Sequence, residues 1–363
     1  MKTTFNNILR PHAEDAFEAE LRAIAAADTK PRPANWKLSP WAVVTYLIGG
    51  QLEDGTSISP KYFGNRRLME IAVATLATDR ALLLVGIPGT GKTWVSEHLA
   101  AAISGDSTRL VQGTAGLDEN ALRYSWNYAK LLAEGPSDAA LVESPVMNAM
   151  QLGKIARIEE LTRISSDVQD TLITLLSEKV LPIPELNTEI QAQRGFNIIA
   201  TANTRDKGVN DLSSALRRRF NTVVLPLPKS LNEEVKIVTM RMEDLGKSLE
   251  LPAHLASIDA VRQLVTIFRE LRSGKTEDGQ AKVKSPSSTL STAEAISVMN
   301  SGLALAVHFG NGVLKADDLA ASIMGAVVKD PKRDKVIWEE YLELVMRERK
   351  DWKELYDACC ALL

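Results

Sequence analysis

The chain has 363 residues, of which 45% are apolar and 25% are charged, and its formal net charge at pH 7 is -3. This length allows two or three compact units, and this composition is typical of a soluble globular protein that buries a sizeable core. The small negative charge argues against a general binder of nucleic acid or of an anionic membrane.

Signals for export, membrane insertion or redox chemistry are weak. Residues Met1 to Arg10 lack the basic stretch and apolar stretch of a secretory signal. The longest apolar run, around Ala81 to Val85, is far shorter than the roughly 18–20 residues that cross a bilayer. The two cysteines, Cys359 and Cys360, are adjacent, and we interpret them as small apolar residues of a terminal helix. We therefore expect a cytoplasmic protein without a membrane segment.

The first 60 residues are predicted to be an N-terminal helical segment. Ala13 to Ala27 is rich in Ala, Glu and Leu with apolar residues at helical spacing, and Pro31 and Pro33 end that helix. A second apolar stretch, residues 41–48, ends at two glycines.

Between residues 61 and 228, short apolar runs alternate with helical stretches. The predicted strands are 81–85, 110–111, 155–158, 196–201 and 222–227. The predicted helices are 67–78, 94–103, 165–179 and 211–220. Such alternation predicts a parallel sheet with helices on both faces, so we treat 61–228 as an α/β core.

Strand signals stop after residue 228. Four helical stretches follow, at 231–245, 258–271, 292–307 and 314–328. We therefore predict a separate all-α domain at 229–330. Pro331 breaks the chain, and 331–363 is predicted to be a final charged helical segment.

A glycine-rich motif follows the predicted strand 81–85 and opens a helix. Its residues are Gly86, Ile87, Pro88, Gly89, Thr90, Gly91, Lys92 and Thr93. The glycines let the backbone curl so that several N–H groups point at one anion, and the helix N-terminus adds its dipole. Lys92 supplies a positive charge for the β- and γ-phosphates, and the Thr93 hydroxyl is placed to bind Mg²⁺. The motif predicts binding of a nucleoside triphosphate.

Two adjacent acids and one amide close later predicted strands. Glu159 and Glu160 end the run 155–158. Glu159 is expected to assist Mg²⁺, commonly through a water, and Glu160 to polarise the attacking water as a general base. The alternative is a solvated acidic helix cap. Asn203, after strand 196–201, is expected to hydrogen-bond the attacking water or the γ-phosphate, although asparagine there is often only a turn former.

Three consecutive arginines, Arg217, Arg218 and Arg219, close a predicted helix and precede Phe220. They either complement the helix dipole or are offered to the γ-phosphate of a neighbouring subunit. We do not expect them to reach the phosphate site of their own chain, so the second interpretation implies an oligomer.

Taken in this order, the motifs resemble those of the AAA+ ATPases, and more narrowly the MoxR-like branch, over roughly residues 60–330. The resemblance implies an α/β P-loop NTPase (AAA+) fold, with a parallel five-stranded sheet of order 5-1-4-3-2 and a C-terminal all-α lid domain. Lys92 and Thr93 match Walker A, Glu159 and Glu160 match Walker B, and Asn203 matches sensor 1. The arginine finger is expected within Arg217 to Arg219, with Arg219 as the first candidate.

Two insertions support the branch and two departures set this chain apart. Residues 113–126 resemble the helix-2 insert, and 179–194 resemble the hairpin that precedes sensor 1; in related hexamers both face the central pore or a partner. The usual Walker B aspartate is Glu159 here. The lid stretch 285–292, where a sensor 2 arginine is usual, offers only hydroxyls.

The resemblance implies a ring, commonly a hexamer, that couples binding and hydrolysis of Mg-ATP to the remodelling or activation of a client protein, often one with a von Willebrand factor A domain. Alternatives are the motor subunit of a metal chelatase, a subunit of a nucleic-acid-directed defence complex, and a nucleotide-binding scaffold with little turnover. No strong basic stripe indicates nucleic acid. The preference for ATP over GTP, and the role of ATP and Mg²⁺ as cofactors, rest on the resemblance.

Overall fold

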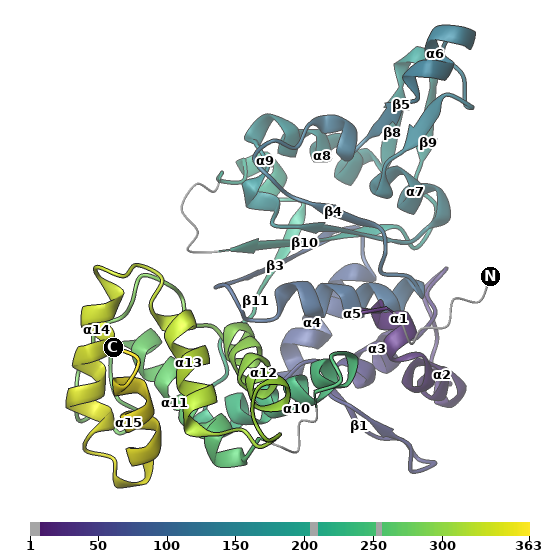
Figure 1. Ribbon diagram of the computed structural model, residues 1–363. Helices are drawn as coiled ribbons and strands as arrows, with labels where there is room; N and C mark the ends of the chain where they lie inside the picture. Colours follow the sequence, from purple (N-terminus) through teal and green to yellow (C-terminus); the bar gives the residue numbers. More distant parts are fainter. Residues whose placement is uncertain (1–7, 204–209, 252–255) are drawn as a thin grey trace. The chain divides into compact units, whose positions relative to one another are not determined.

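The computed structural model describes residues 8–203, 210–251 and 256–363, so most of the stretch 1–10, on which the secretory-signal prediction rests, lies outside it. The chain divides into two compact units (Figure 1). Residues 11–87 and 91–226 form one, called here the α/β unit. Residues 227–363 make up most of the other, called here the helical unit.

A five-stranded parallel sheet forms the centre of the α/β unit. Its order is β11-β3-β10-β7-β4, which numbered in chain order is 5-1-4-3-2, as the resemblance implied. The strands are β3 (Ala81–Gly86), β4 (Leu110–Gln112), β7 (Ile155–Glu159), β10 (Asn197–Asn203) and β11 (Phe220–Val224). The three central strands are buried along almost their whole length, as parallel strands covered on both faces must be. The predicted fold class is confirmed.

Helices cover both faces of this sheet. One face packs against α3 (Pro40–Ile48), α4 (Arg66–Leu76) and α5 (Lys92–Ser104), through a core that includes Leu82 and Leu84 of β3. The N-terminal helices α1 (Ala13–Ala16) and α2 (Glu18–Ala27) join this layer through Ile24 and Phe17. The other face packs against α7 (Pro145–Leu152), α8 (Ser166–Glu178) and α9 (Ser214–Arg217). The N-terminal segment is therefore packed into the same core as the sheet.

Two hairpins lie together at one end of the α/β unit (Figure 1). One pairs β5 (Tyr124–Trp126) with β6 (Leu141–Glu143) and carries α6 (Tyr128–Glu134) between them; the other pairs β8 (Val180–Ile183) with β9 (Thr188–Gln191). The Tyr124 hydroxyl donates to Glu185 Oε2 at 2.8 Å, and Arg123 Nη2 donates to the Pro182 carbonyl at 3.2 Å. The stretch 179–194, which resembles one insertion, contains the β8–β9 hairpin, whereas 113–126, which resembles the other, ends with β5, the first strand of the other hairpin. A third, small hairpin joins β1 (Gly50–Gln51) and β2 (Ser57–Ile58).

Several boundaries differ from the sequence predictions. The helix predicted over 211–220 spans only Ser214–Arg217, because Ala81 N donates to the Arg219 carbonyl at 3.1 Å and draws Phe220 into β11. For the same reason the last strand begins two residues earlier than predicted and ends at Val224. The predicted N-terminal helix is interrupted at Phe17, whose φ and ψ of -117° and 25° are not helical.

The helical unit is built from helices that share one apolar core. They are α10 (Leu231–Ser248), α11 (Ile258–Ser273), α12 (Thr292–His308), α13 (Ala316–Val327), α14 (Asp334–Tyr341) and α15 (Lys353–Cys360). Trp338 and Tyr341 are fully buried in this core, so the predicted boundary at 330/331 falls inside a continuous packing unit. The final helical segment predicted over 331–363 is interrupted by a π-helical turn at Leu342–Met346 and a 3₁₀ turn at Lys350–Trp352.

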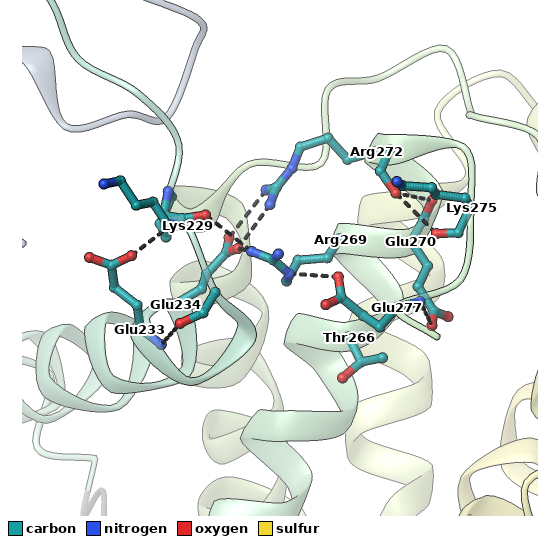
Figure 2. A network of polar contacts seen from close by, with 12 residues as sticks. Lys229, Glu233, Glu234, Thr266, Arg269, Glu270, Arg272, Lys275 and Glu277 are labelled. Carbon is teal, nitrogen blue, oxygen red and sulfur yellow. Dashed lines mark hydrogen bonds and ion pairs between the residues drawn. The ribbon is translucent and has the colours of Figure 1, made fainter. Parts of the chain in front are cut away.

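Two buried glutamates hold these helices together (Figure 2). Glu234 of α10 accepts hydrogen bonds from Arg269 (3.0 Å), Arg272 (2.8 Å) and Thr292 (2.6 Å), which come from α11 and α12. Burial of Glu234 favours its neutral form, but the Arg272 and Arg269 guanidiniums and the Thr292 hydroxyl outweigh that effect and lower its pKa. The carboxylate therefore stays charged and fully paired in the interior.

Glu270 of α11 is the buried glutamate that holds the C-terminal segment. It accepts hydrogen bonds from the Tyr341 hydroxyl and from Arg349 Nη2, both at 2.6 Å, and from the Glu277 backbone N–H at 2.9 Å. Burial, together with the charge of Glu270, raises the pKa of Tyr341 well above its usual value. These contacts tie the chain after residue 334 to α11.

Within the described ranges, none of the helices combines the length and the apolar character that crossing a membrane requires. Cys359 is buried and Cys360 half-buried, both as free thiols, and burial raises the pKa of Cys359 to about 12.

We predict that Glu234→Ala destabilises the helical unit by about 3–5 kcal/mol, because the half-buried Arg272 loses its carboxylate and Arg269 keeps only Glu277. Urea unfolding of the full chain, with hydrogen exchange of α10 and α11, measures the effect. The folded-state pKa of Glu234 lies below its ordinary value of 4.5, so its contribution is present at neutral pH and is lost as the pH falls through that lowered pKa. The difference in the free energy of unfolding between wild type and Glu234→Ala should therefore become smaller in acid.

Arg347→Ala is the matched control. It breaks an exposed pair in which Arg347 lies 2.9 Å from Glu343, and solvent already screens that interaction. Equal stability of the Glu234→Ala and Arg347→Ala proteins would contradict the assigned role of Glu234.

Candidate nucleotide site

The glycine-rich loop connects the carboxyl end of β3 to the start of α5. Gly89 and Gly91 have φ of 81° and 79°, a left-handed conformation that glycine adopts without strain. The Lys92 side chain folds back over the loop, and its Nζ donates to the carbonyls of Gly86 (3.0 Å) and Ile87 (2.9 Å). Lys92 is only 8% exposed. Its ammonium is thus held at the loop rather than extended into solvent.

Glu159 forms the most densely bonded point of the site. Its Oε2 accepts from the hydroxyls of Thr93 (2.9 Å) and Thr201 (2.6 Å). Its Oε1 accepts from Arg157 Nη2 (2.9 Å) and from the Ser96 hydroxyl. The residue is 1% exposed. The structure therefore joins two residues predicted from separate motifs, Thr93 and Glu159, by a direct hydrogen bond.

Glu160 has a different environment from its neighbour. Its backbone is left-handed, with φ 54°, and its N–H donates to Thr201 Oγ1 at 3.0 Å. Its side chain is 35% exposed, and Oε2 lies 2.6 Å from Arg163 Nε. Asn203 lies opposite Gly86 in the register of β10 with β3, so it sits beside the start of the phosphate loop. Of the two acids, Glu160 is the one that solvent reaches.

The three arginines lie away from these residues. The Arg219 carbonyl is bonded to Ala81 N, at the amino end of β3, whereas the phosphate loop starts from Gly86 at the carboxyl end. Ala81 and Gly86 are five residue steps apart, which is roughly 16 Å at about 3.3 Å per residue. The arginines therefore belong to the opposite edge of the sheet from the loop.

The arginines also differ among themselves. Arg219 donates through Nη1 to the Ala215 carbonyl at 2.6 Å and through Nε to the Ser177 hydroxyl. Arg217 and Arg218 are exposed and line a surface cavity of about 450 Å³ together with Asp211, Leu212 and Ser214. Arg217 and Arg218 are thus presented to solvent, while Arg219 is bonded within its own chain.

Three residues of the site were not identified from sequence: Ser96, Arg157 and Thr201. The sequence does point to Arg157, because a charged residue in the middle of an otherwise apolar strand needs a buried partner. No sequence pattern points to Ser96 or Thr201, because their role depends on the packing of α5 and β10 against β7.

A backbone contact fixes the turn that carries the two acids. Gly113 N donates to the Glu159 carbonyl at 2.7 Å. A Cβ added at Gly113 would lie 2.5 Å from the Glu160 carbonyl oxygen and 2.8 Å from that of Glu159. Only glycine leaves room for this approach.

The aromatic residues beside α5 and those on the β5–β6 hairpin differ in exposure. Trp94 Nε1 donates to the Lys61 carbonyl at 2.9 Å, and its ring packs on His98 with centroids 4.1 Å apart. Tyr62 and Tyr124 are buried, whereas Tyr128, on the hairpin, is 70% exposed. Tyr128 is the aromatic of this group that is most open to a partner.

The residues present fit a magnesium ion. The Thr93 hydroxyl offers an oxygen ligand, the kind that Mg²⁺ prefers, and Glu159 accepts its proton from behind. In the part of the chain that the structure describes, no group of three or more His, Cys, Asp or Glu side chains is arranged to hold a metal by itself. A cation here would complete its ligands with water and phosphate oxygens.

The stretch 285–292 has no arginine, but one lies against it. Arg272 Nη1 donates to the Leu290 carbonyl at 2.9 Å, just before the start of α12. Hydroxyls of the stretch bond to other parts of the helical unit: Ser287 donates to Asp334 and Thr292 to Glu234, both at 2.6 Å. Ser291 caps α12 together with Glu294. Arg272 of α11 therefore contacts this stretch while it is also held by Glu234.

We predict that Gly113→Ala destabilises the α/β unit by about 1–3 kcal/mol, because the methyl group would displace the turn carrying Glu159 and Glu160. Hydrogen exchange of residues 155–164 in the full chain should report local loosening. Gly116→Ala is the control, since a Cβ at Gly116 meets nothing within 4 Å. Unchanged protection in the Gly113→Ala protein would contradict this packing role.

Comparison with known proteins adds the family. Residues 81–220 match the AAA domain of the dynein-related subfamily, and residues 232–362 match the YehL-like AAA+ ATPase C-terminal domain. The chain is 38% identical to the protein YehL of Escherichia coli strain K12 over 361 residues, which cover 97% of each chain. It is 29% identical over 150 residues to the protein SH1500 of Staphylococcus haemolyticus strain JCSC1435, covering 41% of this chain and 56% of that one.

Among solved structures, NtrX from Brucella abortus in complex with ATP aligns with a TM-score of 0.49 and 13% identity, covering 84% of this chain and 69% of that one. The full-length match to YehL and the two family models confirm the resemblance that the motifs indicated. The chain is an AAA+ ATPase of the MoxR-like family and belongs with YehL.

Proposed function

We propose that the chain binds Mg-ATP at the loop between β3 and α5 and hydrolyses it. The observation that carries this proposal is the Thr93–Glu159 hydrogen bond of 2.9 Å, which places the hydroxyl of the phosphate loop against a buried carboxylate. A Gly-rich loop at a helix N-terminus, a lysine held over it and this oxygen pair are the parts that phosphoryl-transfer sites share.

The residues divide the work according to their exposure. Lys92 exchanges its bonds to two loop carbonyls for the β- and γ-phosphates. Thr93, with its proton directed to Glu159, presents its lone pairs to the cation. Mg²⁺, when bound, supplies charge neutralisation for the phosphate oxygens. Glu160 is accessible to water and is assigned the general base, and Asn203 orients the water or γ-phosphate from the tip of β10.

The arginines act in a neighbouring subunit in this proposal. They lie at the sheet edge opposite their own phosphate loop, so one of Arg217, Arg218 and Arg219 is assigned to the γ-phosphate bound by the next subunit. Such sharing requires an oligomer, and a ring, commonly a hexamer in related proteins, is its natural form. Hydrolysis would then be coupled to movement between subunits.

The work done with ATP is proposed to be the remodelling of a client protein. The two contacting hairpins of the α/β unit, with exposed Tyr128 and Leu132, offer a surface for such a client. A von Willebrand factor A domain as the client rests on the family resemblance alone. The chelatase and defence-complex alternatives share the same nucleotide chemistry and differ in the partner that co-purifies with the ring.

One observation favours a second function, a nucleotide-binding scaffold with little turnover. The Glu160 carboxylate is paired with Arg163 at 2.6 Å, so one of its oxygens is already engaged and is not free to accept a proton from water. Turnover would then require Arg163 to release Glu160.

We predict that Glu160→Gln binds ATP with wild-type affinity but releases phosphate at least about 100-fold more slowly, because the amide cannot accept the proton of the attacking water. Phosphate release at saturating Mg-ATP, with nucleotide affinity from calorimetry, separates the two effects. Glu134→Gln, an exposed glutamate of α6, is the control. Equal and negligible turnover by wild type and Glu160→Gln in the assembled state would support the scaffold.

We predict that one of the single substitutions Arg217→Ala, Arg218→Ala and Arg219→Ala lowers turnover by about 10³-fold or more without weakening nucleotide binding, because the finger acts only on transition-state charge. The other two serve as matched controls of equal charge change. Mixing the finger variant with a Lys92→Ala protein should restore activity at interfaces that pair an intact loop with an intact arginine. Full activity of all three variants in an assembled state would exclude the triplet as the finger.

A further inference from the structure

A buried arginine lies beneath the proposed metal site. Arg157 is in the middle of β7, between Ile155 and Glu159 on the same face of the strand, and is 3% exposed. Charged side chains are almost never this buried unless a partner compensates them. None of the assigned roles above uses this residue.

Every nitrogen of its guanidinium is engaged. Nε donates to Ser96 Oγ (3.2 Å), Nη1 to the Ser107 carbonyl (3.1 Å), and Nη2 to the Thr93 carbonyl (3.3 Å) and to Glu159 Oε1 (2.9 Å). Arg157 thus holds both the first turn of α5, which carries Lys92 and Thr93, and the carboxylate of Glu159. A planar fork of donors makes such a set of bonds, whereas an ammonium would not reach all of them.

The carboxylate of Glu159 is saturated by this arrangement. Each of its oxygens accepts two hydrogen bonds, which is about the capacity of a carboxylate. A cation has no free lone pair on Glu159 to bind directly, so the contact is made through Thr93 or a water. The charge of Glu159 is also matched by Arg157 before a cation arrives.

We propose that Arg157 is a positioning residue that makes divalent-cation binding depend on the nucleotide. Because the Arg157–Glu159 pair has no net charge, the protein offers a cation little attraction by itself, and the phosphates supply the negative charge that draws it in. The inference rests on the proposed function of the site and adds to it the order of events: the cation binds as a cation–nucleotide complex, not ahead of the nucleotide.

The first test measures Mn²⁺ binding to the nucleotide-free full chain by the loss of the free-ion electron paramagnetic resonance signal. Arg157→Met leaves the Glu159 charge unmatched, so Mn²⁺ should bind at least about tenfold more tightly than to wild type. Arg157→Lys keeps the charge and should stay at the wild-type level. The double variant Arg157→Met/Glu159→Gln should return to that level as well. Thermal melting establishes that each protein is folded.

Arg109→Met is the matched control. Arg109 is a half-buried arginine paired with Asp106 in the same unit, so its removal changes the charge by the same amount. Asp106 keeps its ion pair with Lys154 at 3.3 Å, so no carboxylate is left unmatched. Its Mn²⁺ affinity should equal that of wild type. The proposal would be overturned if Arg109→Met bound Mn²⁺ as tightly as Arg157→Met does. It would also be overturned if a folded Arg157→Met protein bound Mn²⁺ no more tightly than wild type.

The second test serves if Arg157→Met does not fold. Glu159→Gln keeps the shape of the side chain but leaves the Arg157 charge unmatched, so a fluorescent ATP analogue should bind at least about tenfold more tightly in EDTA than it binds to wild type. Unchanged affinity in EDTA would overturn the proposal. If wild type fails to bind the analogue even with Mg²⁺, the proposed function fails, while the Mn²⁺ measurements still decide the role of Arg157.

Discussion

The nucleotide site depends on one buried carboxylate. Glu159 receives donors from α5 (Thr93 and Ser96), from its own strand (Arg157) and from β10 (Thr201), so three elements meet on two oxygen atoms. Thr201 in turn accepts the N–H of Glu160, which places the proposed base. A shift of any of these elements would move the phosphate loop, the cation site and the base together. The low-dielectric surroundings make these bonds strong, and make each one costly to leave unmade.

The same device recurs in the helical unit. Glu234 and Glu270 are fully buried, and each is held by guanidinium and hydroxyl donors from other segments of the chain. A buried ion pair contributes little net stability over an apolar core, but it admits few alternative packings. In both units, therefore, an acid in the interior fixes how neighbouring helices and strands meet. Exposed pairs such as Arg347 with Glu343 lack this effect because water competes for both partners.

Local patterns predicted the parts of the fold that local physics decides. The apolar run at 81–85, the loop that follows and the acids at 159–160 all lie where the motifs indicated. The predicted length of α9 and the predicted start of β11 were wrong. Both are set by the hydrogen bond between Ala81 and Arg219, which are distant in sequence. The π-helical turn at Leu342–Met346 could not be predicted, because the pattern of apolar residues there is that of an ordinary helix. The roles of Ser96 and Thr201 could not be predicted for the same reason as the length of α9, because their partners come from other elements.

The separation of the arginines from the phosphate loop across the sheet has a consequence for symmetry. A two-fold dimer joins its subunits through one self-complementary patch, so a shared site there would need the loop and the arginines of each subunit to lie within that same patch. A site made of one edge from each subunit requires a head-to-tail contact instead. Repeated head-to-tail contacts either close after a whole number of subunits or continue into a filament. The rotation between neighbours, set where the Arg217–Arg219 edge docks, would then decide between a closed ring and an open helix.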